Sequence, residues 1–299
     1  MPSAPAAPRP PRSRVVLVGA IACALLLASC SSGKPVKFDG NAFLEAVFQP
    51  DGLILGGLAL TLVVSIIAQV IGVVLGVFGA LGRLSRRLTL RSIARFYLWI
   101  FRGTPLVVQL TLFYFGLGAI HVYNWDAITI GPFTLPGSIQ AGIFAIGLNE
   151  GAYMTEIIRA GILSIDPGQM EAAKSVGMTY GQAMRRIILP QAARVIVPPL
   201  GNEFNNMLKT TALLFVLGVQ ELYNTFVIKA GTNFLPFEMY LACAIWFLLL
   251  TTLWGFVQNY IERRLERGAP GSSVPSGPGL TARLLGFRNA SGNQVAGRM

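Results

Sequence analysis

Acidic and amide side chains occur inside apolar segments of this 299-residue chain. Such groups are costly in hydrocarbon, so they usually face the interior of a helix bundle and line the path of a solute or an ion. The candidates are Asn149, Glu150, Asn202, Glu203, Asn205 and Asn206. Carboxylates can pair with a cationic group and amides can exchange hydrogen bonds, so these residues predict a route for a polar solute. The alternative is that they only hydrogen-bond neighbouring helices.

The two polar clusters fall at comparable depths if their segments are helical. At a rise of about 1.5 Å per residue, Glu150 lies about 20 Å from the start of its segment at Gly137. Asn202 and Glu203 lie about 18 to 20 Å from Pro190, at the opposite end of the next segment. Each cluster therefore lies past the membrane centre, measured from the end at which its own segment begins. At these depths both clusters can line one route.

The composition identifies the medium around these segments. Hydrophobic residues make up 53% of the chain, charged residues 12%, and the mean hydropathy is +0.59. Soluble domains carry about 25% charged residues, so this composition indicates a membrane protein and argues against a soluble enzyme. The net charge of +11 comes from basic segments between apolar runs, which is typical of membrane topology and not of nucleic-acid binding. The three cysteines show no metal-ligand spacing and no disulfide framework, so no metal site is expected.

We expect an all-α polytopic membrane helical bundle with about five core transmembrane helices. The expected spans cover residues 53–81, 102–120, 137–158, 194–209 and 237–256. Basic segments follow the first, third and fifth spans, whereas residues 121–136 contain no Lys or Arg. The positive-inside rule therefore places the basic segments and the C-terminus in the cytoplasm. Glycines expected to let helices pack closely are Gly56, Gly57, Gly72, Gly76 and Gly79.

Four regions are expected along the chain. Residues 1–30 end in Leu27-Ala28-Ser29-Cys30 and resemble a secretory signal with a lipoprotein-type box, in which Cys30 takes the lipid. The alternative is an anchor retained as a membrane helix. Residues 31–52 are expected to be an extracytoplasmic linker, 53–267 the transmembrane domain, and 268–299 a disordered cytoplasmic tail.

The cytoplasmic loop of about residues 166–190 predicts two short helices with a corner between them. Asp166 and Pro167 suit the cap and the first position of a helix that Gly177 can close in a left-handed conformation. Thr179 and Gln182 repeat a capping pattern and begin a second helix, expected to end before Pro190. Such a pair is marginal alone, so its apolar side needs a partner surface.

The internal spacing of this loop resembles the EAA loop of ABC importer permeases. Glu171-Ala172-Ala173 is followed by Gly177 and then by Ile187-x-Leu189-Pro190, as in that family. Segments 101–105, 151–159 and 198–204 narrow the resemblance to the polar amino-acid subfamily. One departure is Lys209-Thr210-Thr211-Ala212-Leu213, where the subfamily usually has Lys-Asp-Thr-Ser-Leu or a near variant.

The resemblance implies a type I ABC importer permease in a bacterial-type plasma (inner) membrane, moving polar amino acids inward. It implies that Glu171, Ala172, Ala173 and Gly177 contact a cytoplasmic ABC ATPase subunit. It also implies an extracytoplasmic solute-binding protein and a second permease chain, the same or similar. The chain has no G-x-x-x-x-G-K-[ST] phosphate loop, so it is not expected to be an enzyme. ATP and Mg are expected in the partner ATPase, with no cofactor in this chain.

Two other functions compete with this interpretation. An ion-coupled secondary transporter or channel acting without an ATPase would use Glu150 and Glu203 as coupling sites, but no convincing internal repeat supports it. A membrane hydrolase lacks a catalytic constellation, since the sole histidine, His121, falls in the expected external loop. Glu156 and Arg159, three residues apart, are expected to form a boundary salt bridge.

Overall fold

The computed structural model describes residues 38–266, which form helices joined by short loops and one β-hairpin. The helices are α2 (Gly40–Phe48), α3 (Gly52–Leu84), α4 (Leu88–Gly103), α5 (Leu106–Thr111), α6 (Leu117–Ala119), α7 (Gly137–Leu163), α8 (Pro167–Ser175), α9 (Tyr180–Ala183), α10 (Leu189–Thr210), α11 (Leu222–Asn233) and α12 (Pro236–Glu266). Leu112–Gly116 and Met184–Ile188 are π-helical turns, and Thr211–Leu217 is a 3₁₀ helix. Strands β1 (Ile128–Ile130) and β2 (Phe133–Leu135) pair antiparallel, with Ile128 opposite Leu135. The predictions for residues 1–30, including Cys30, and for the tail 268–299 lie outside the described residues.

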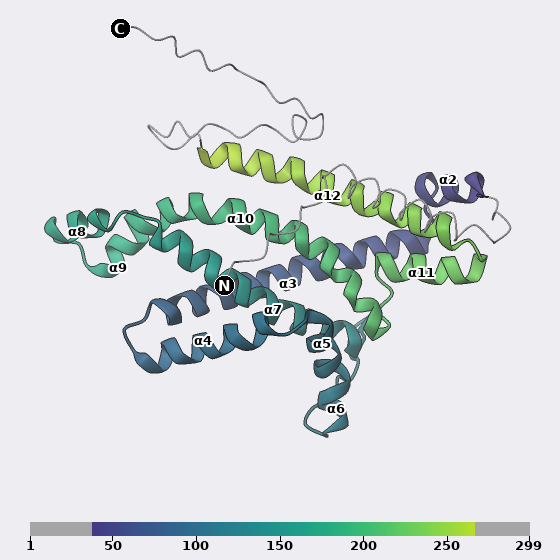
Figure 1. The fold of residues 1–299 in the computed structure, drawn as a ribbon, viewed down its shortest axis with the longest axis horizontal. Helices are drawn as coiled ribbons and strands as arrows, with labels where there is room; N and C mark the ends of the chain where they lie inside the picture. The colour runs from purple at the N-terminus through teal and green to yellow at the C-terminus, as the bar shows by residue number, and fades with distance from the viewer. Residues whose placement is uncertain (1–37, 267–299) are drawn as a thin grey trace, which may run out of the picture.

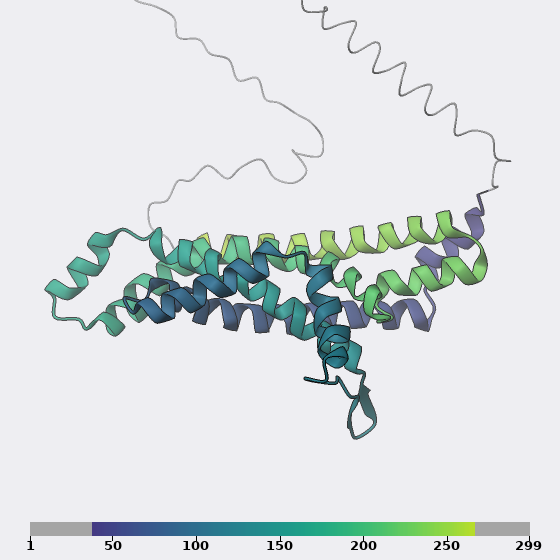
Figure 2. The same cartoon turned by 60° about the horizontal axis from the view of Figure 1, so that its bottom comes forward.

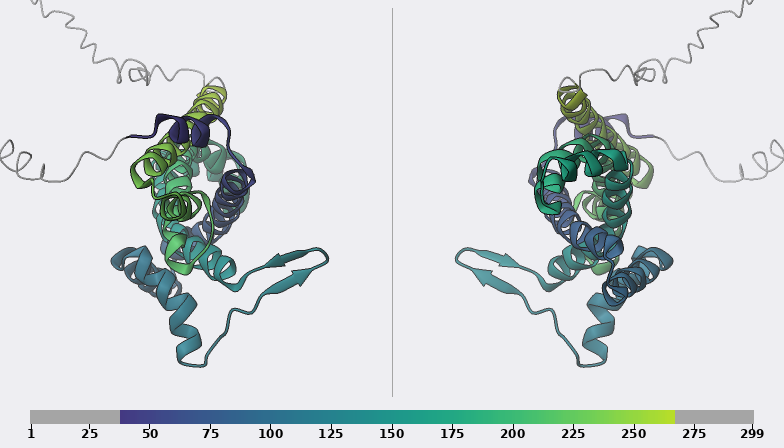
Figure 3. Two further views of the ribbon diagram at one scale, coloured as in Figure 1. Left: turned by 90° about the vertical axis from the view of Figure 1, so that its right-hand side faces the viewer. Right: turned by 90° about the vertical axis from the view of Figure 1, so that its left-hand side faces the viewer.

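The long helices lie roughly along one direction, and shorter elements mark the two ends of the bundle (Figure 1). Helices α8 and α9 project at one end, whereas α2 and α11 lie at the other (Figure 2). Seen along the bundle, α5 and α6 extend to one side and the hairpin to the other (Figure 3). The helices of the expected cytoplasmic loop and helix α2, which falls in the expected extracytoplasmic linker, therefore lie at opposite ends of the bundle, whereas the hairpin of the expected external loop extends to the side.

Single helices and bent helix pairs supply the candidate membrane spans. By length and apolarity, α3 and α12 can each cross a membrane alone. Helix α4 and the segment Leu106–Ala119 meet at a bend of 103°. The segment Tyr180–Leu217 and α11 meet at a bend of 52°. By length and composition, each of these two pairs can form one broken span. A span formed by the first of these pairs would begin at Leu88, whereas the expected second span began near residue 102. Thr104 and Pro105 form the break between α4 and α5, because proline has no N–H to continue the helical ladder.

Helix α7 has a different composition because it lies at the centre of the bundle. Its 27 residues are long enough to cross a hydrocarbon layer of about 30 Å. Of these residues, 13 are buried against the rest of the protein. A helix that contacts mainly other helices needs no apolar surface toward lipid, so α7 can carry the acid and the asparagine that the apolar run of α3 lacks.

Three glycines let α3 approach α7 closely. A Cβ at Gly72, Gly76 or Gly79 would overlap Glu150, Met154 or Thr155 respectively. Gly57 meets Thr225 and Glu221 in the same way. The predicted packing role is confirmed for these four glycines and is wrong for Gly56, which has no described atom within 4 Å of such a Cβ.

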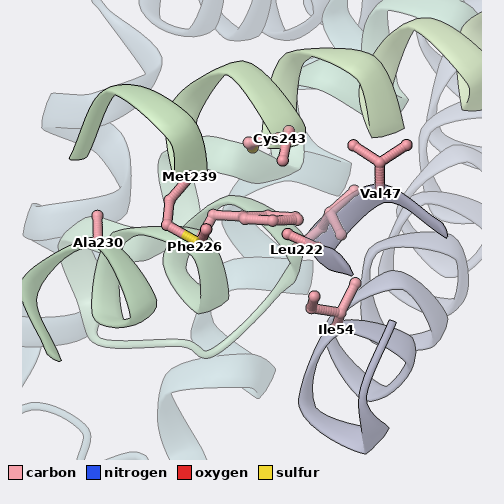
Figure 4. Packing of buried hydrophobic residues seen from close by; sticks show 9 residues of the cluster. Val47, Ile54, Leu222, Phe226, Ala230, Met239 and Cys243 are labelled. Atoms are coloured by element: carbon pink, nitrogen blue, oxygen red, sulfur yellow. The ribbon is translucent and has the colours of Figure 1, made fainter. Parts of the chain in front are cut away.

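The end of the bundle formed by α2 and α11 has its own apolar core, shown in Figure 4. Val47 of α2 and Ile54 of α3 pack in one buried cluster with Phe226 of α11 and Met239 and Cys243 of α12. The Asp39 carboxylate caps α2, and the Asp39 N–H donates to Glu238 Oε1 at 2.8 Å. The linker expected over residues 31–52 therefore contains a helix, because α2 buries Ala46 and Val47 against its neighbours.

Candidate functional site

A cavity of about 380 Å³ is lined by residues of α5, α7 and α10. Its polar lining includes Asn149 and Glu150 from α7, and Glu203 and Asn206 from α10. Apolar lining comes from Leu106, Ile146, Met207 and Leu213. The structure thus brings four of the predicted pathway residues to one space, although they are about fifty positions apart in the sequence.

The Glu150 side chain is buried and is held from α3. Gln69 Nε2 donates to Glu150 Oε1 at 3.1 Å. Gly72, which contacts the Glu150 side chain, lies 20 residues into the 33-residue α3, which is about 30 Å along it and beyond its middle. The carboxylate therefore faces the cavity at a depth where only protein or cavity water can solvate it.

Asn149 connects the cavity wall to the break in the second span. Its Nδ2 donates to the Phe101 carbonyl at 2.9 Å and to Gln109 Oε1 at 3.0 Å. Gln109 Nε2 in turn donates to Thr104 Oγ1 at 2.8 Å. These bonds satisfy backbone groups that the break leaves without helical partners. The shape of this wall consequently depends on Asn149 and Gln109.

The sequence analysis missed Gln69 and Gln109 as contributors to this site. Both are amides inside apolar runs, which is the signal that selected Asn149. They form the hydrogen bonds that orient Glu150 and Asn149. Applying the same criterion to every amide in the chain could have found them.

Asn202 and Asn205 do not line this cavity with the other candidates. Asn202 is exposed, and its Oδ1 accepts from Gln258 Nε2 of α12 at 3.2 Å. Glu203 and Asn206 are three residues apart and share a helix face, whereas Asn202 is rotated by about 100° from Glu203. Asn205 Oδ1 is buried and has no hydrogen-bond partner among the described residues. The structure therefore separates Asn202 and Asn205 from the predicted route.

The helix pair α8–α9 forms largely as predicted. Asp166 Oδ1 accepts from the Gly168 N–H at 2.7 Å, and Gly177 has a φ of 84° at the corner. Thr179 and Gln182 form a reciprocal capping box at the start of α9. The prediction that this second helix ends before Pro190 is wrong, because it continues through a π-helical turn into α10 and places Pro190 in the first turn of that helix. The chain from α9 to Thr210 is thus continuously helical.

The outer surface of this pair carries the predicted partner-contact residues. Glu171 and Ala172 are exposed, whereas Ala173 is buried within the pair. Val176 is 77% exposed and Tyr180 is 61% exposed. These exposed apolar side chains lie at the projecting end of the bundle. They form a surface suited to contact with another protein.

An ion-pair group lies near the same end of the bundle. Arg159 Nη2 lies 2.8 Å from Glu156 Oε2, so the predicted salt bridge is confirmed. Arg83 Nε of α3 lies 3.4 Å from the other oxygen of Glu156. This carboxylate therefore joins the ends of α3 and α7.

Comparisons with known proteins agree with this arrangement. Residues 72–267 match the family described as binding-protein-dependent transport system inner membrane component. The arginine transport system permease protein ArgU of Corynebacterium glutamicum is 40% identical over 232 residues, covering 75% of this chain and 70% of ArgU. The probable amino-acid permease protein YxeN of Bacillus subtilis is 38% identical over 212 residues, covering 70% of this chain and 90% of YxeN. The crystal structure of an amino acid ABC transporter with histidines contains a chain that is 39% identical, with a TM-score of 0.66, and the match covers 77% of this chain and all of that one.

Proposed function

Because the chain belongs to the family of binding-protein-dependent transport system inner membrane components, we propose that a polar amino acid passes through its cavity between α7 and α10. The protein is a multi-pass membrane protein and the permease subunit of an amino-acid ABC importer. It is a transport component, and ATP hydrolysis with Mg belongs to a separate partner chain. The secondary transporter or channel is not favoured, since the family and the matched structures are ABC importers.

The observation that carries the cargo proposal is that Glu150 and Glu203 face one cavity. Two carboxylates beside one cavity favour a cationic ligand, because an ion pair with the ligand compensates for the hydration that the charged groups lose on binding. The amides of Asn149 and Asn206 can meet the polar atoms of an amino acid. The resemblance to a permease named for arginine transport supports the same class. The cargo we infer is a cationic amino acid.

The projecting helix pair supports a second step of the proposal, coupling to ATP hydrolysis. Glu171, Ala172 and the exposed Val176 would dock in a groove on a cytoplasmic ATPase subunit, and the Gly177 corner would set the angle of the pair. Continuous helix from Tyr180 to Thr210 would carry movement of the docked pair to Glu203 and Asn206. ATPase closure would in this way change the cavity.

The remaining partners follow from the proposed orientation. The positively charged end of the bundle and the C-terminus face the cytoplasm. An extracytoplasmic solute-binding protein delivers the amino acid at the opposite end, near α2, α11 and the hairpin. A second permease chain, the same or similar, completes the passage, because so few spans do not enclose one.

Uptake by the reconstituted importer tests the cargo proposal. The wild-type chain and the variants Glu150→Gln and Glu203→Gln are assembled with the ATPase and the solute-binding protein in vesicles, and uptake of labelled arginine and glutamine is compared. Each variant's ratio of arginine uptake to glutamine uptake is divided by the wild-type ratio. Because every sample contains the same solute-binding protein, the cargo preference of that protein cancels in this quotient. We expect this ratio to fall about tenfold, since an ion pair is lost while the shape is kept.

The matched control is Glu45→Gln, which removes an exposed carboxylate from α2. It is expected to leave the ratio unchanged. Equal loss of arginine and glutamine uptake in both cavity variants would assign Glu150 and Glu203 to helix packing and exclude them from cargo recognition.

A further inference from the structure

A second hollow lies where the ends of α3, α4 and α7 meet, and it is not part of the proposed cargo site. This groove of about 550 Å³ is lined chiefly by Arg83 of α3, by Arg95, Trp99 and Arg102 of α4, and by Tyr153 and Glu156 of α7. We name it the arginine groove. Tyr153 is the single described residue that lines both this groove and the cargo cavity.

The arginine groove carries more positive than negative charge. Its carboxylate, Glu156, is already shared between Arg83 at 3.4 Å and Arg159 at 2.8 Å. Within residues 38–266, neither Arg95 nor Arg102 has a carboxylate oxygen within 4.0 Å. The Arg102 guanidinium lies 5.3 Å from the centroid of the Tyr153 ring, which offers an aromatic face but no negative charge. The groove is therefore suited to an anion.

The depth of the groove matches the boundary between lipid headgroups and hydrocarbon. The apolar run of α3 ends at Leu81, two residues before Arg83. Gly82 faces Ala94, so Arg95 is level with the end of that run. Arg102 lies about 10 Å farther along α4, within reach of the interface for a long side chain that extends toward the headgroups.

Aromatic residues beside the groove point to the same boundary. Trp99 is 71% exposed and Phe96 is 60% exposed. Their rings stack with centroids 5.8 Å apart. Exposed aromatic rings, Trp above all, are enriched at membrane interfaces, where the ring contacts acyl chains and polar headgroups together.

We propose that the arginine groove binds the phosphodiester headgroup of an anionic phospholipid, with an acyl chain lying along the exposed rings of Phe96 and Trp99. Guanidinium groups bind phosphate oxygens through paired N–H donors, and Arg95 and Arg102 supply two such groups in one hollow. The surrounding bilayer provides this ligand at high concentration. A free phosphate would satisfy the charge but would leave Trp99 without a contact. The inference concerns the lipid around the permease and goes beyond the proposed transport function.

Quenching of Trp99 fluorescence tests the proposal. The purified importer is placed in vesicles of phosphatidylcholine that contain increasing fractions of chain-brominated phosphatidylglycerol or chain-brominated phosphatidylcholine. The contribution of Trp99 is the difference between the wild-type protein and Trp99→Phe. For each brominated lipid, we measure the lipid fraction that gives half-maximal quenching of Trp99. We expect this fraction to be at least about fivefold lower for phosphatidylglycerol than for phosphatidylcholine. A factor of this size is the effect of roughly one arginine charge at a membrane surface.

The double variant Arg95→Gln/Arg102→Gln is expected to abolish this preference. The matched control is Arg264→Gln, because Arg264 also stacks on a tyrosine, with 5.0 Å to the Tyr260 centroid, but lies at the end of α12 outside the groove. It should keep the preference. If the double variant fails to fold, the comparison of the two brominated lipids on the wild-type protein still decides the question.

Three results would overturn the proposal. Equal quenching by the two lipids would show that the groove does not select anionic headgroups. Absence of any Trp99 quenching would show that another protein chain covers the groove. Loss of the preference on adding millimolar glycerol phosphate would assign the groove to a soluble anion.

Discussion

The helix pair α8–α9, which we propose as the coupling pair, and the proposed cargo cavity are built in opposite ways. The pair depends on contacts between near neighbours: Asp166 with Gly168, Thr179 with Gln182, and the glycine corner between them. The cavity depends on contacts between distant segments, such as Gln69 with Glu150, 81 positions apart. Local contacts survive when helices shift, whereas the cavity exists only while α3, α5, α7 and α10 keep their packing. Changes at the two regions should therefore have different effects on stability and on activity.

The largest effect is expected when the α3–α7 contact is broken. Gly76→Val places a side chain against Met154 and the α7 backbone, and overpacking of this kind costs about 1–3 kcal/mol or more. We expect a lower yield of monodisperse protein and a lower thermal unfolding temperature in detergent. Gly56→Val is the control, because the added side chain meets open space there. Equal unfolding temperatures for the two variants would contradict the close packing of α3 on α7.

A charge reversal at the coupling pair should affect activity and leave stability intact. Glu171 is exposed, so Glu171→Lys should keep the wild-type unfolding temperature. Copurification with the ATPase should fall about tenfold, because the ATPase groove that accommodates the Glu171 carboxylate then meets a positively charged lysine. Glu45→Lys makes the same exchange on exposed α2 at the other end of the molecule. Full ATPase binding by Glu171→Lys would remove this residue from the coupling site.

Alanine substitutions of two asparagines distinguish the cavity wall from the face of α10 that contacts α12. Asn149→Ala removes hydrogen bonds to the Phe101 carbonyl and to Gln109 Oε1 in the cavity wall. The Phe101 carbonyl keeps a donor in Gln109 Nε2, so the cost is that of the Gln109 oxygen left without a donor, about 1–3 kcal/mol. We expect amino-acid uptake to fall roughly tenfold. Asn202→Ala removes a bond on the α12 side and should change uptake less than about twofold. The reverse order of effects would place the cargo route on the other face of α10.

The smallest effect concerns the end of the bundle formed by α2 and α11, and its dependence on pH. The hydrogen bond from Lys229, 2.6 Å from Asp51 Oδ2, lowers the pKa of Asp51 below its ordinary value of 3.8. A lowered pKa stabilises the folded protein above pH 3.8, and this contribution disappears as the pH falls through the lowered pKa. Asp51→Asn keeps a capping side chain but loses the ion pair. At pH 7 its free energy of unfolding should therefore be lower than that of the wild type by about 0.2–1 kcal/mol, which is typical of exposed pairs.

The difference between Asp51→Asn and wild type should vanish at a pH below the lowered pKa. Thermal unfolding in detergent at neutral and acidic pH measures it. Asp126→Asn, at an exposed carboxylate of the external loop, corrects for general effects of acid. A difference that persists unchanged at acidic pH would show that the Lys229 ion pair does not stabilise this end.

Short segments of the sequence were sufficient for the membrane class and for the coupling pair. Composition and apolar runs report the surrounding solvent without any knowledge of packing. The Thr179–Gln182 box, the Gly177 corner and the Glu156–Arg159 pair each involve residues at most three positions apart or a single backbone conformation. Interactions on that scale are set by helix geometry alone, so these features could be predicted.

The cargo cavity was only partly predictable, because helix periodicity shows which residues share a face but not which neighbour that face meets. Glu203 and Asn202 are adjacent polar residues in the sequence, yet packing of α10 between α7 and α12 turns the first to the cavity and the second to Gln258. Gly56 and Gly57 are likewise adjacent, and only Gly57 meets a helix. The helix within residues 31–52 also has a partner far along the chain, since the Asp39 N–H at its start donates to Glu238. Long-range packing therefore decided which of the polar residues form a site.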